Sequence, residues 1–185
     1  FVGHPFFENF EKNQNNYNAD SNIISFCPGS RQSEIKIFMP IFLEIMNFLG
    51  SKYIYHFAIT NSTNHTIQKY LEDIDKSQII ITSDENEKKK YFTKSLISIA
   101  KSGTISLDLC KSQIPFFTIY KFNWLNYFLI IPFVKVKFVN IVNIIANKEI
   151  IPEFIQANCN SKKIINHLYF LLNNKNELKK MIADY

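Results

Sequence analysis

The sequence predicts an α/β fold in which a Rossmann-like parallel sheet carries helices on both faces. Five short apolar runs rich in β-branched residues alternate with segments of helical periodicity or helix-start signals. Strands and helices that alternate in this way form a doubly wound parallel sheet with right-handed crossovers. The 185 residues suffice for one ordinary domain, and 46% apolar with 20% charged residues is a globular composition.

The first strand–turn–helix unit sets the pattern. Residues 23–27 are predicted to form a buried strand that stops at Pro28-Gly29, and apolar residues then recur at helical spacing up to residue 49. We expect Ser30 to cap this helix by accepting a hydrogen bond from the N–H of Ser33. Free N–H groups at such a helix start suit a phosphate, and Arg31 could add a bidentate contact. A strand, a turn and a surface arginine give the same pattern, and spacing alone favours that simpler interpretation.

The next elements follow in order along the chain. Further strands are expected over 53–59, 78–82, 95–100 and 115–120, with helices over 64–74, from about residue 83, and over 105–110. Residues 83–90 carry acids first and bases later, an order that matches the helix dipole. We therefore interpret that segment as a solvated helix start and not as a binding patch.

A second turn follows the strand over 95–100. Ser102-Gly103-Thr104 closes that strand, so N–H groups at the next helix start face the carboxyl edge of the sheet, where α/β folds bind ligands. Asp108 lies one helical turn beyond Thr104 and could reach a ribose or sugar hydroxyl. A solvated helix carboxylate is the simpler interpretation of Asp108 taken alone.

The segment over 124–139 is very apolar and aromatic. Asn126, Pro132, Lys135 and Lys137 interrupt it, whereas a membrane span needs roughly 20 clean apolar residues, so we predict no transmembrane helix. A core helix plus a strand is one interpretation. The other is an apolar surface that meets acyl chains or lipid, with the two lysines at headgroup level.

Polar residues and two amphipathic segments complete the chain. A polar island of Asn143, Asn147, Lys148 and Glu149 lies between apolar runs, where a loop is expected and functional residues are often found. Residues 161–172 and 175–185 have the periodicity of amphipathic helices.

Charge and cysteine usage narrow the possible partners. The net charge of +5 favours an anionic partner, but the positive residues are scattered and predict no nucleic-acid face. Cys27, Cys110 and Cys159 are far apart, so we expect reduced thiols in a cytosolic protein, with neither disulfide nor zinc site. The four histidines lack metal-ligand spacing, and no signal peptide is recognisable. Because the chain starts without Met, we expect it to be a fragment.

Several of these motifs together resemble a known family. Gly3-His4-Pro5, Pro28-Gly29-Ser30-Arg31 followed by Glu34, Ser102-Gly103-Thr104, and residues 134–139 leading to 143–146 and Lys148-Glu149 are similar to bacterial lipid-A-disaccharide synthases. Glycine turns of this kind occur in many nucleotide-sugar enzymes, but the combination and its order are specific. The resemblance covers the C-terminal half of that family.

This resemblance implies a fold and a reaction. It implies the C-terminal, donor-binding domain of a two-domain GT-B glycosyltransferase. The family transfers 2,3-diacylglucosamine from UDP-2,3-diacylglucosamine to 2,3-diacylglucosamine 1-phosphate, which gives the lipid A disaccharide 1-phosphate and UDP. No cofactor or metal is expected, and the general base belongs to the missing N-terminal half. The fragment alone is expected to be inactive.

The resemblance also implies an organisation. Residues 1–22 would be a strand end and linker from the missing N-terminal domain, 23–160 the UDP-sugar-binding domain, and 161–185 helices that pack on the other domain or a second subunit. The expected place is the cytoplasmic side of the inner membrane of a Gram-negative bacterium, with peripheral association and a possible homodimer. No nucleic acid is expected.

Site residues follow only from motif matches. The residues implied to bind the UDP-sugar are Ser30, Arg31, Ser102, Gly103, Thr104, Asp108, Asn143, Lys148 and Glu149. Three positions depart from the family pattern: Lys148 stands where Arg is usual, Asp108 where Glu is usual, and Asn147 where Gly is usual. A lysine offers a point charge instead of a planar fork, which weakens any bidentate phosphate contact.

Two other functions remain open. One is a different UDP-sugar enzyme of the same fold, such as a peptidoglycan glucosaminyltransferase or an epimerase. The other is a non-catalytic α/β module whose surface over 124–139 docks a partner protein or a membrane.

Overall fold

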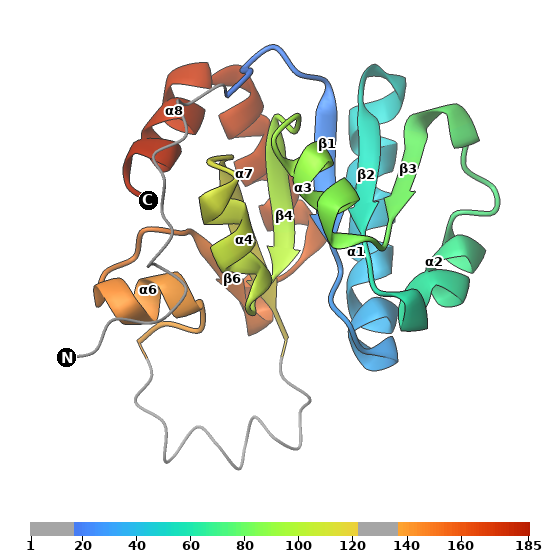
Figure 1. Ribbon diagram of the computed structural model, residues 1–185, viewed down its shortest axis with the longest axis horizontal. Helices are drawn as coiled ribbons and strands as arrows, with labels where there is room; N and C mark the ends of the chain where they lie inside the picture. The colour runs from blue at the N-terminus through green and yellow to red at the C-terminus, as the bar shows by residue number, and fades with distance from the viewer. Residues whose placement is uncertain (1–16, 122–136) are drawn as a thin grey trace.

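The computed structural model describes residues 17–121 and 137–185 (Figure 1). The strands of the sheet are β1 (Ile23–Cys27), β2 (Ile54–Ala58), β3 (Ile79–Thr82), β4 (Ile97–Lys101), β5 (Phe116–Tyr120) and β6 (Glu153–Ile155). The helices are α1 (Gln32–Leu49), α2 (Asn64–Tyr70), α3 (Glu85–Phe92), α4 (Ile105–Lys111), α6 (Ile141–Ala146), α7 (Ser161–Asn173) and α8 (Lys175–Ala183).

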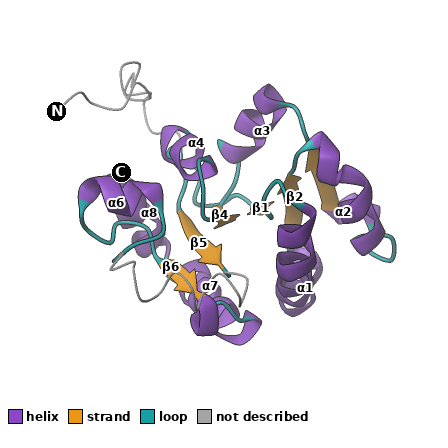
Figure 2. Ribbon diagram, turned by 90° about the horizontal axis from the view of Figure 1, so that it is seen from below, coloured by secondary structure: helices purple, strands orange, loops and turns teal. Residues whose placement is uncertain are grey.

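The strands form one parallel sheet in the order β3-β2-β1-β4-β5-β6. This is the order of a doubly wound Rossmann-type sheet, in which the chain reverses its direction of travel between β1 and β4. Helices α1 and α7 lie on one face and α3 and α4 on the other, as Figure 2 shows from below. The predicted α/β fold class is therefore confirmed.

Each face of the sheet has its own core. On the face of α1 and α7, Phe26 of β1 stacks on Phe42 of α1 with ring centroids 4.5 Å apart, and also on Tyr55 of β2 at 5.9 Å. On the opposite face, Phe92 of α3 and Leu109 of α4 pack against the short side chains of the central strands. Strands buried on both faces read as continuous apolar runs, which is why the sequence revealed them.

Two elements differ from the sequence-based expectation. A loop was expected over 143–149, but its first part is helix α6. Asn140 caps this helix by accepting a hydrogen bond from the N–H of Val142 at 2.8 Å, and Asn147 ends it in a left-handed conformation. Of the two asparagines that suggested a loop, Asn147 lies at the C-terminal end of the helix, where asparagine is favoured, and Asn143 lies inside it. Strand β6 was also missed, because three residues at a sheet edge carry too short a pattern.

The two C-terminal helices pack on this sheet. Ile164, Leu168 and Leu171 of α7 and Leu178 of α8 are buried in the same core as α1. Packing on another domain or a second subunit would use their outer faces and stays a prediction, as does the division at residues 22 and 160. The expected interpretations of residues 1–16 and most of the segment over 124–139 lie outside the described residues. Among the described residues, no helix is long and apolar enough to cross a membrane.

All three cysteines are buried free thiols. Burial raises the pKa of the Cys27 and Cys110 thiols to about 12 and that of the Cys159 thiol to about 11, because a thiolate is poorly solvated inside the fold.

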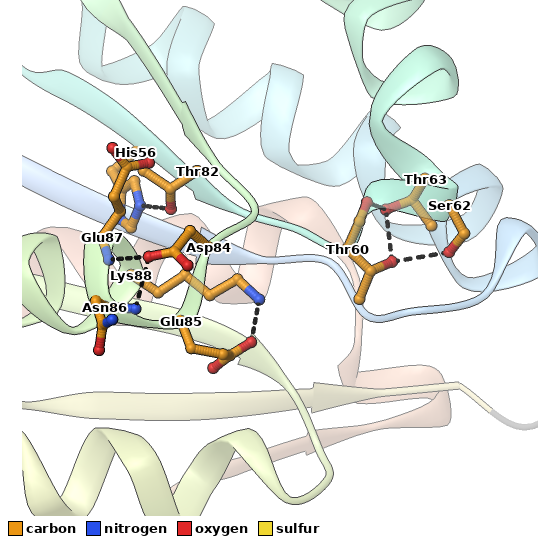
Figure 3. Close-up of polar contacts among 10 residues, drawn as sticks. All are labelled: His56, Thr60, Ser62, Thr63, Thr82, Asp84, Glu85, Asn86, Glu87 and Lys88. Carbon is orange, nitrogen blue, oxygen red and sulfur yellow. Dashed lines mark hydrogen bonds and ion pairs between the residues drawn. The ribbon is translucent and has the colours of Figure 1, made fainter.

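A chain of polar side chains crosses the buried sheet on the α3 side. The Oγ of Ser25 lies 2.7 Å from Nδ1 of His56 and 2.6 Å from Oγ of Ser95. Nε2 of His56 lies 2.8 Å from Oγ1 of Thr82, a contact that Figure 3 shows. Both ring nitrogens of this fully buried histidine are thereby satisfied. Burial first, and the nearby Lys88 second, lower the pKa of His56 from 6.5 to about 4.

The stability of the fold should therefore fall in acid. His56 is protonated near pH 6.5 in the unfolded chain but only near pH 4 in the folded chain. Its contribution to the free energy of unfolding is therefore complete above pH 6.5 and is lost as the pH falls from 6.5 towards 4. At pH 5 the loss from His56 is about 2 kcal/mol. Urea denaturation at pH 8 and pH 5 measures it.

A His56→Gln variant provides the comparison. It should be less stable at pH 8 but lose about 2 kcal/mol less than the natural chain on going to pH 5. The other histidines are unchanged in the variant, so their contributions cancel. Equal losses in the two proteins would contradict the assigned role of His56.

Candidate functional site

The two glycine turns predicted from the sequence lie side by side. Cys27 at the end of β1 is paired with Ala100, next to the end of β4, so the chain leaves both strands at neighbouring points of the carboxyl edge. Figure 1 shows the arrowhead of β4 pointing to this edge, and Figure 2 looks onto the molecule from that side. The turns thus flank the point between β1 and β4 where doubly wound sheets open a ligand crevice.

The first turn is built around the carboxylate of Glu34. Its Oε2 accepts hydrogen bonds from the N–H groups of Ser30 at 3.0 Å and Arg31 at 3.2 Å. Gly29 has φ of 105°, and a Cβ placed on it would lie 2.3 Å from the same oxygen. A glycine is therefore required here both by its backbone conformation and by the approach of the carboxylate.

This arrangement corrects two expectations about the first turn. Helix α1 begins at Gln32, so the residue at its N-cap is Arg31 and not Ser30. The N–H groups of Ser30 and Arg31 are not free for a phosphate, because a glutamate of the same chain already occupies them. A glutamate three residues after the N-cap is a known helix-start signal, and Glu34 stands in that relation to Arg31.

A lysine joins the two turns. Nζ of Lys101, the last residue of β4, lies 3.1 Å from Oε1 of Glu34 and 5.3 Å from the ring centre of Tyr120. Nη1 of Arg31 lies 3.8 Å from the same glutamate oxygen, and the Arg31 side chain is 79% exposed. Lys101 was not among the site residues expected from the sequence, because a lysine at a strand end carries no motif signal.

The second turn is tied to the segment that follows β5. Ser102 is buried, and its hydroxyl donates to the carbonyl of Val139 at 3.2 Å. Asn140 extends this link, since its side-chain N–H donates to Oγ of Ser106 in α4 at 2.9 Å. Thr104 precedes α4, is exposed, and forms no side-chain cap. Of the three turn residues, Thr104 therefore presents its side chain to a ligand most openly.

Asn143 holds the segment after α6 in place. Its Oδ1 accepts hydrogen bonds from the N–H groups of Ile150 and Ile151, each at 2.8 Å. Its amide nitrogen donates to the carbonyl of Ile151 at 2.7 Å and to Glu153 at 3.0 Å. The side chain is fully buried. Asn143 thus fixes the backbone of the polar segment by buried hydrogen bonds, while Lys148 and Glu149 lie exposed beyond the end of α6.

Asp108 belongs to α4 and interacts electrostatically with residues of α3. It is partly buried, and burial is the main cause that raises the pKa of its carboxyl, with Glu85 next and three lysines acting in the opposite sense. One of these lysines, Lys88, is itself buried and bonds Glu85 at 2.7 Å (Figure 3). Asp108 is therefore part of a charged group shared by two helices and not a fully solvated carboxylate.

The structure thus brings part of the expected set together. Ser30, Arg31 and the Ser102-Gly103-Thr104 turn meet at one point of the sheet edge. Asn143 is linked to that point indirectly: it donates to Glu153, whose carboxylate also accepts hydrogen bonds from the N–H groups of Val139 and Asn140. Contact of these residues with a UDP-sugar stays a prediction.

Replacing Gly29 by alanine should test how the first turn is built. The added Cβ would push the Glu34 carboxylate off the two N–H groups, and a positive φ is strained for alanine. Gly50→Ala is the control, since Gly50 has φ of 66° but open space around it. Thermal denaturation should show Gly29→Ala about 1–2 kcal/mol less stable than Gly50→Ala. Equal stabilities would show that the carboxylate does not depend on the missing side chain.

Replacing Asn143 by aspartate should disrupt the segment after α6. The new carboxylate would face Glu153 and the carbonyl of Ile151 in a buried position, where the amide had donated to both. We expect a loss of about 3 kcal/mol or more in the free energy of unfolding. Asn147→Asp, at an exposed position in the left-handed conformation that aspartate tolerates, should change it by less than about 0.5 kcal/mol.

Comparison with known sequences identifies relatives. The family model described as lipid-A-disaccharide synthetase matches residues 1–184. The lipid-A-disaccharide synthase of Rickettsia prowazekii (strain Madrid E) is 32% identical over 94% of this chain and 48% of the relative. That of Rickettsia canadensis (strain McKiel) is 33% identical over 100% of the chain and 50% of the relative. The chain therefore spans about half the length of the curated relatives it matches.

Solved structures share the fold at low sequence identity. UDP-GlcNAc 2-epimerase from Neisseria meningitidis bound to UDP-GlcNAc has a TM-score of 0.61 with 14% identity, over 89% of this chain and 40% of that one. The E. coli ADP-heptose lps heptosyltransferase II has a TM-score of 0.60 with 7% identity, over 86% and 49%. These likenesses show the fold alone. By its sequence and its Rossmann-like sheet, the chain belongs to the lipid-A-disaccharide synthase family.

Proposed function

We propose that this chain is the donor-binding half of a lipid-A-disaccharide synthase. In the reaction, 2,3-diacylglucosamine passes from UDP-2,3-diacylglucosamine to 2,3-diacylglucosamine 1-phosphate, and UDP is released. The observation that carries the proposal is the meeting of the Pro28-Gly29-Ser30-Arg31 and Ser102-Gly103-Thr104 turns at the switch point of the sheet. Family membership supports the chemistry, and the length of the relatives supports a second half that completes the site.

Arg31 is the best candidate for a direct contact with the diphosphate. It is the only arginine in a sequence whose other 20 such cations are lysines. A chain so strongly biased towards lysine that retains arginine here points to a need for the planar guanidinium, which pairs bidentately with phosphate oxygens. Its side chain is 79% exposed at the carboxyl edge of the sheet, so it can turn towards a ligand.

The proposed mechanism is electrostatic. Negative charge develops on UDP as the glycosidic bond breaks, and Arg31 together with the N–H groups and Thr104 of the second turn stabilises it. Glu34 occupies N–H groups at the first turn, so cations carry more of this work there than backbone groups do. The acceptor hydroxyl attacks the anomeric carbon from the opposite side, activated by a general base from the N-terminal half.

The proposal has consequences for the location of the protein and for the activity of the purified chain. The acylated substrates put it on the cytoplasmic face of the inner membrane of a Gram-negative bacterium, with peripheral association and a homodimer as further proposals. By itself the 185-residue chain should bind UDP and form no disaccharide, because half of the length of its relatives is absent. Disaccharide formed by the purified chain from both lipid substrates would refute this half-enzyme assignment.

Calorimetric titration with UDP tests donor binding. Arg31→Ala should weaken UDP binding about 10- to 100-fold, because a charge-assisted contact contributes about 1.5–3 kcal/mol. Arg31→Lys should recover only part of the affinity, because the charge returns without the fork. Thr104→Ala should weaken binding by a smaller factor.

Lys36→Ala is the matched control, since Lys36 is an exposed cation of the same helix. It should bind UDP as the natural chain does. A natural chain that is folded and shows no saturable binding of UDP would count against the donor-binding role.

A different UDP-sugar enzyme of the same fold is the second candidate. The likeness to an epimerase solved with UDP-GlcNAc, at a TM-score of 0.61, is the observation in its favour. Competition separates the two: acyl-free UDP-GlcNAc should displace UDP as well as the acylated donor does only if the second candidate is right.

A further inference from the structure

Lys101 lies where the two turns of the candidate site meet. It is the last residue of β4, and Ser102 follows it directly. Its Nζ lies 3.1 Å from Oε1 of Glu34, and 3.8 Å from the position that a Cβ on Gly103 would take. The ammonium thus bonds Glu34 of the first turn and lies close to Gly103 of the second turn.

Two contacts restrict the position of this ammonium. Glu34 holds it by charge, and the ring of Tyr120 at the end of β5 lies 5.3 Å from it, within the range of a cation–π contact. The Lys101 side chain is only 19% exposed and that of Glu34 13%. A lysine held in this way loses little further conformational entropy when it binds a ligand.

The two carboxylate oxygens of Glu34 have different partners: the backbone N–H groups bond Oε2, and Lys101 bonds Oε1. Arg31 also lies within 4 Å of this carboxylate. Together, Arg31, Lys101 and Glu34 are two cations and one anion, an excess of positive charge at this edge of the sheet. An ammonium has three N–H donors, so Lys101 can bond Glu34 and still donate to a phosphate oxygen.

We propose that Lys101 binds the diphosphate of the sugar nucleotide and that Glu34 is the positioning residue that holds its ammonium between the two turns. This inference rests on the proposed function, because it assigns a further residue to the same site. Phosphate oxygens can accept hydrogen bonds from both groups: Lys101 offers a partly buried point charge, and Arg31 an exposed planar fork.

Lys101→Met tests the first part, because methionine keeps the aliphatic length and removes the charge. Titration of the full chain with UDP should show about tenfold weaker binding or more. Lys101→Arg should restore part of the affinity. Uridine has no phosphate, so its binding, followed by ligand-observed NMR, should be the same in all these proteins.

Lys94→Met is the matched control. Lys94 is exposed and precedes the opposite, amino-terminal end of the same strand. Its UDP affinity should equal that of the natural chain. If Lys101→Met also binds UDP as the natural chain does, the proposal for Lys101 is overturned while the donor-binding function stands. If the natural chain binds no UDP at all, both are overturned.

Glu34→Gln tests the positioning role. The amide keeps a hydrogen-bond acceptor for the first turn but removes the charge that holds Lys101, so UDP affinity should fall while uridine binding is unchanged. A loss of both affinities would assign Glu34 to the fold alone, and tighter UDP binding would show that its carboxylate competes with the phosphate. Either outcome overturns the positioning role. The melting temperature of each variant shows that the fold is kept.

Discussion

The pairing of β1 with β4 is the constraint on which the site depends. These strands are separated by about 70 residues of chain that form β2, β3 and three helices, yet their backbones are hydrogen-bonded side by side. A parallel sheet brings the carboxyl ends of its strands to one edge, and the change of winding direction leaves a crevice there. The two glycine turns need no further structure to bring them together. Their proximity is a property of the strand order.

The carboxylate of Glu34 changes the electrostatics expected at this crevice. A free helix start offers N–H groups and a partial positive charge, whereas here a carboxylate of the same helix neutralises part of both. What remains positive are two side chains, the exposed Arg31 and the confined Lys101. The Glu34 carboxylate fixes the shape of the turn. A phosphate would then be bound by the side chains of Arg31 and Lys101 more than by backbone N–H groups, and these two side chains differ in exposure and geometry.

The sequence predicted what depends on burial on both faces of the sheet. Residues 23–27 and 115–120 are mostly apolar, so the strands, their order of occurrence and the turns after them could be predicted. Contacts made through single polar side chains could not be predicted from the sequence. The i,i+3 relation of Arg31 and Glu34 was visible, but the bond from Lys101 to Glu34 spans 67 positions and follows no local pattern. The motif match predicted that Asn143 contacts a ligand. Only the fold shows that both the oxygen and the nitrogen of its side-chain amide are bonded within the protein.

The three buried cysteines have a practical consequence. Thiolates are the reactive species in alkylation, and the raised pKa of each thiol leaves almost none at neutral pH. We therefore expect the three buried thiols of the folded chain to react only slowly with a maleimide. A single cysteine introduced at the surface would carry a fluorophore without removal of the native thiols. The same thiols become reactive when their surroundings open, so the rate of their labelling measures local unfolding on each side of the sheet.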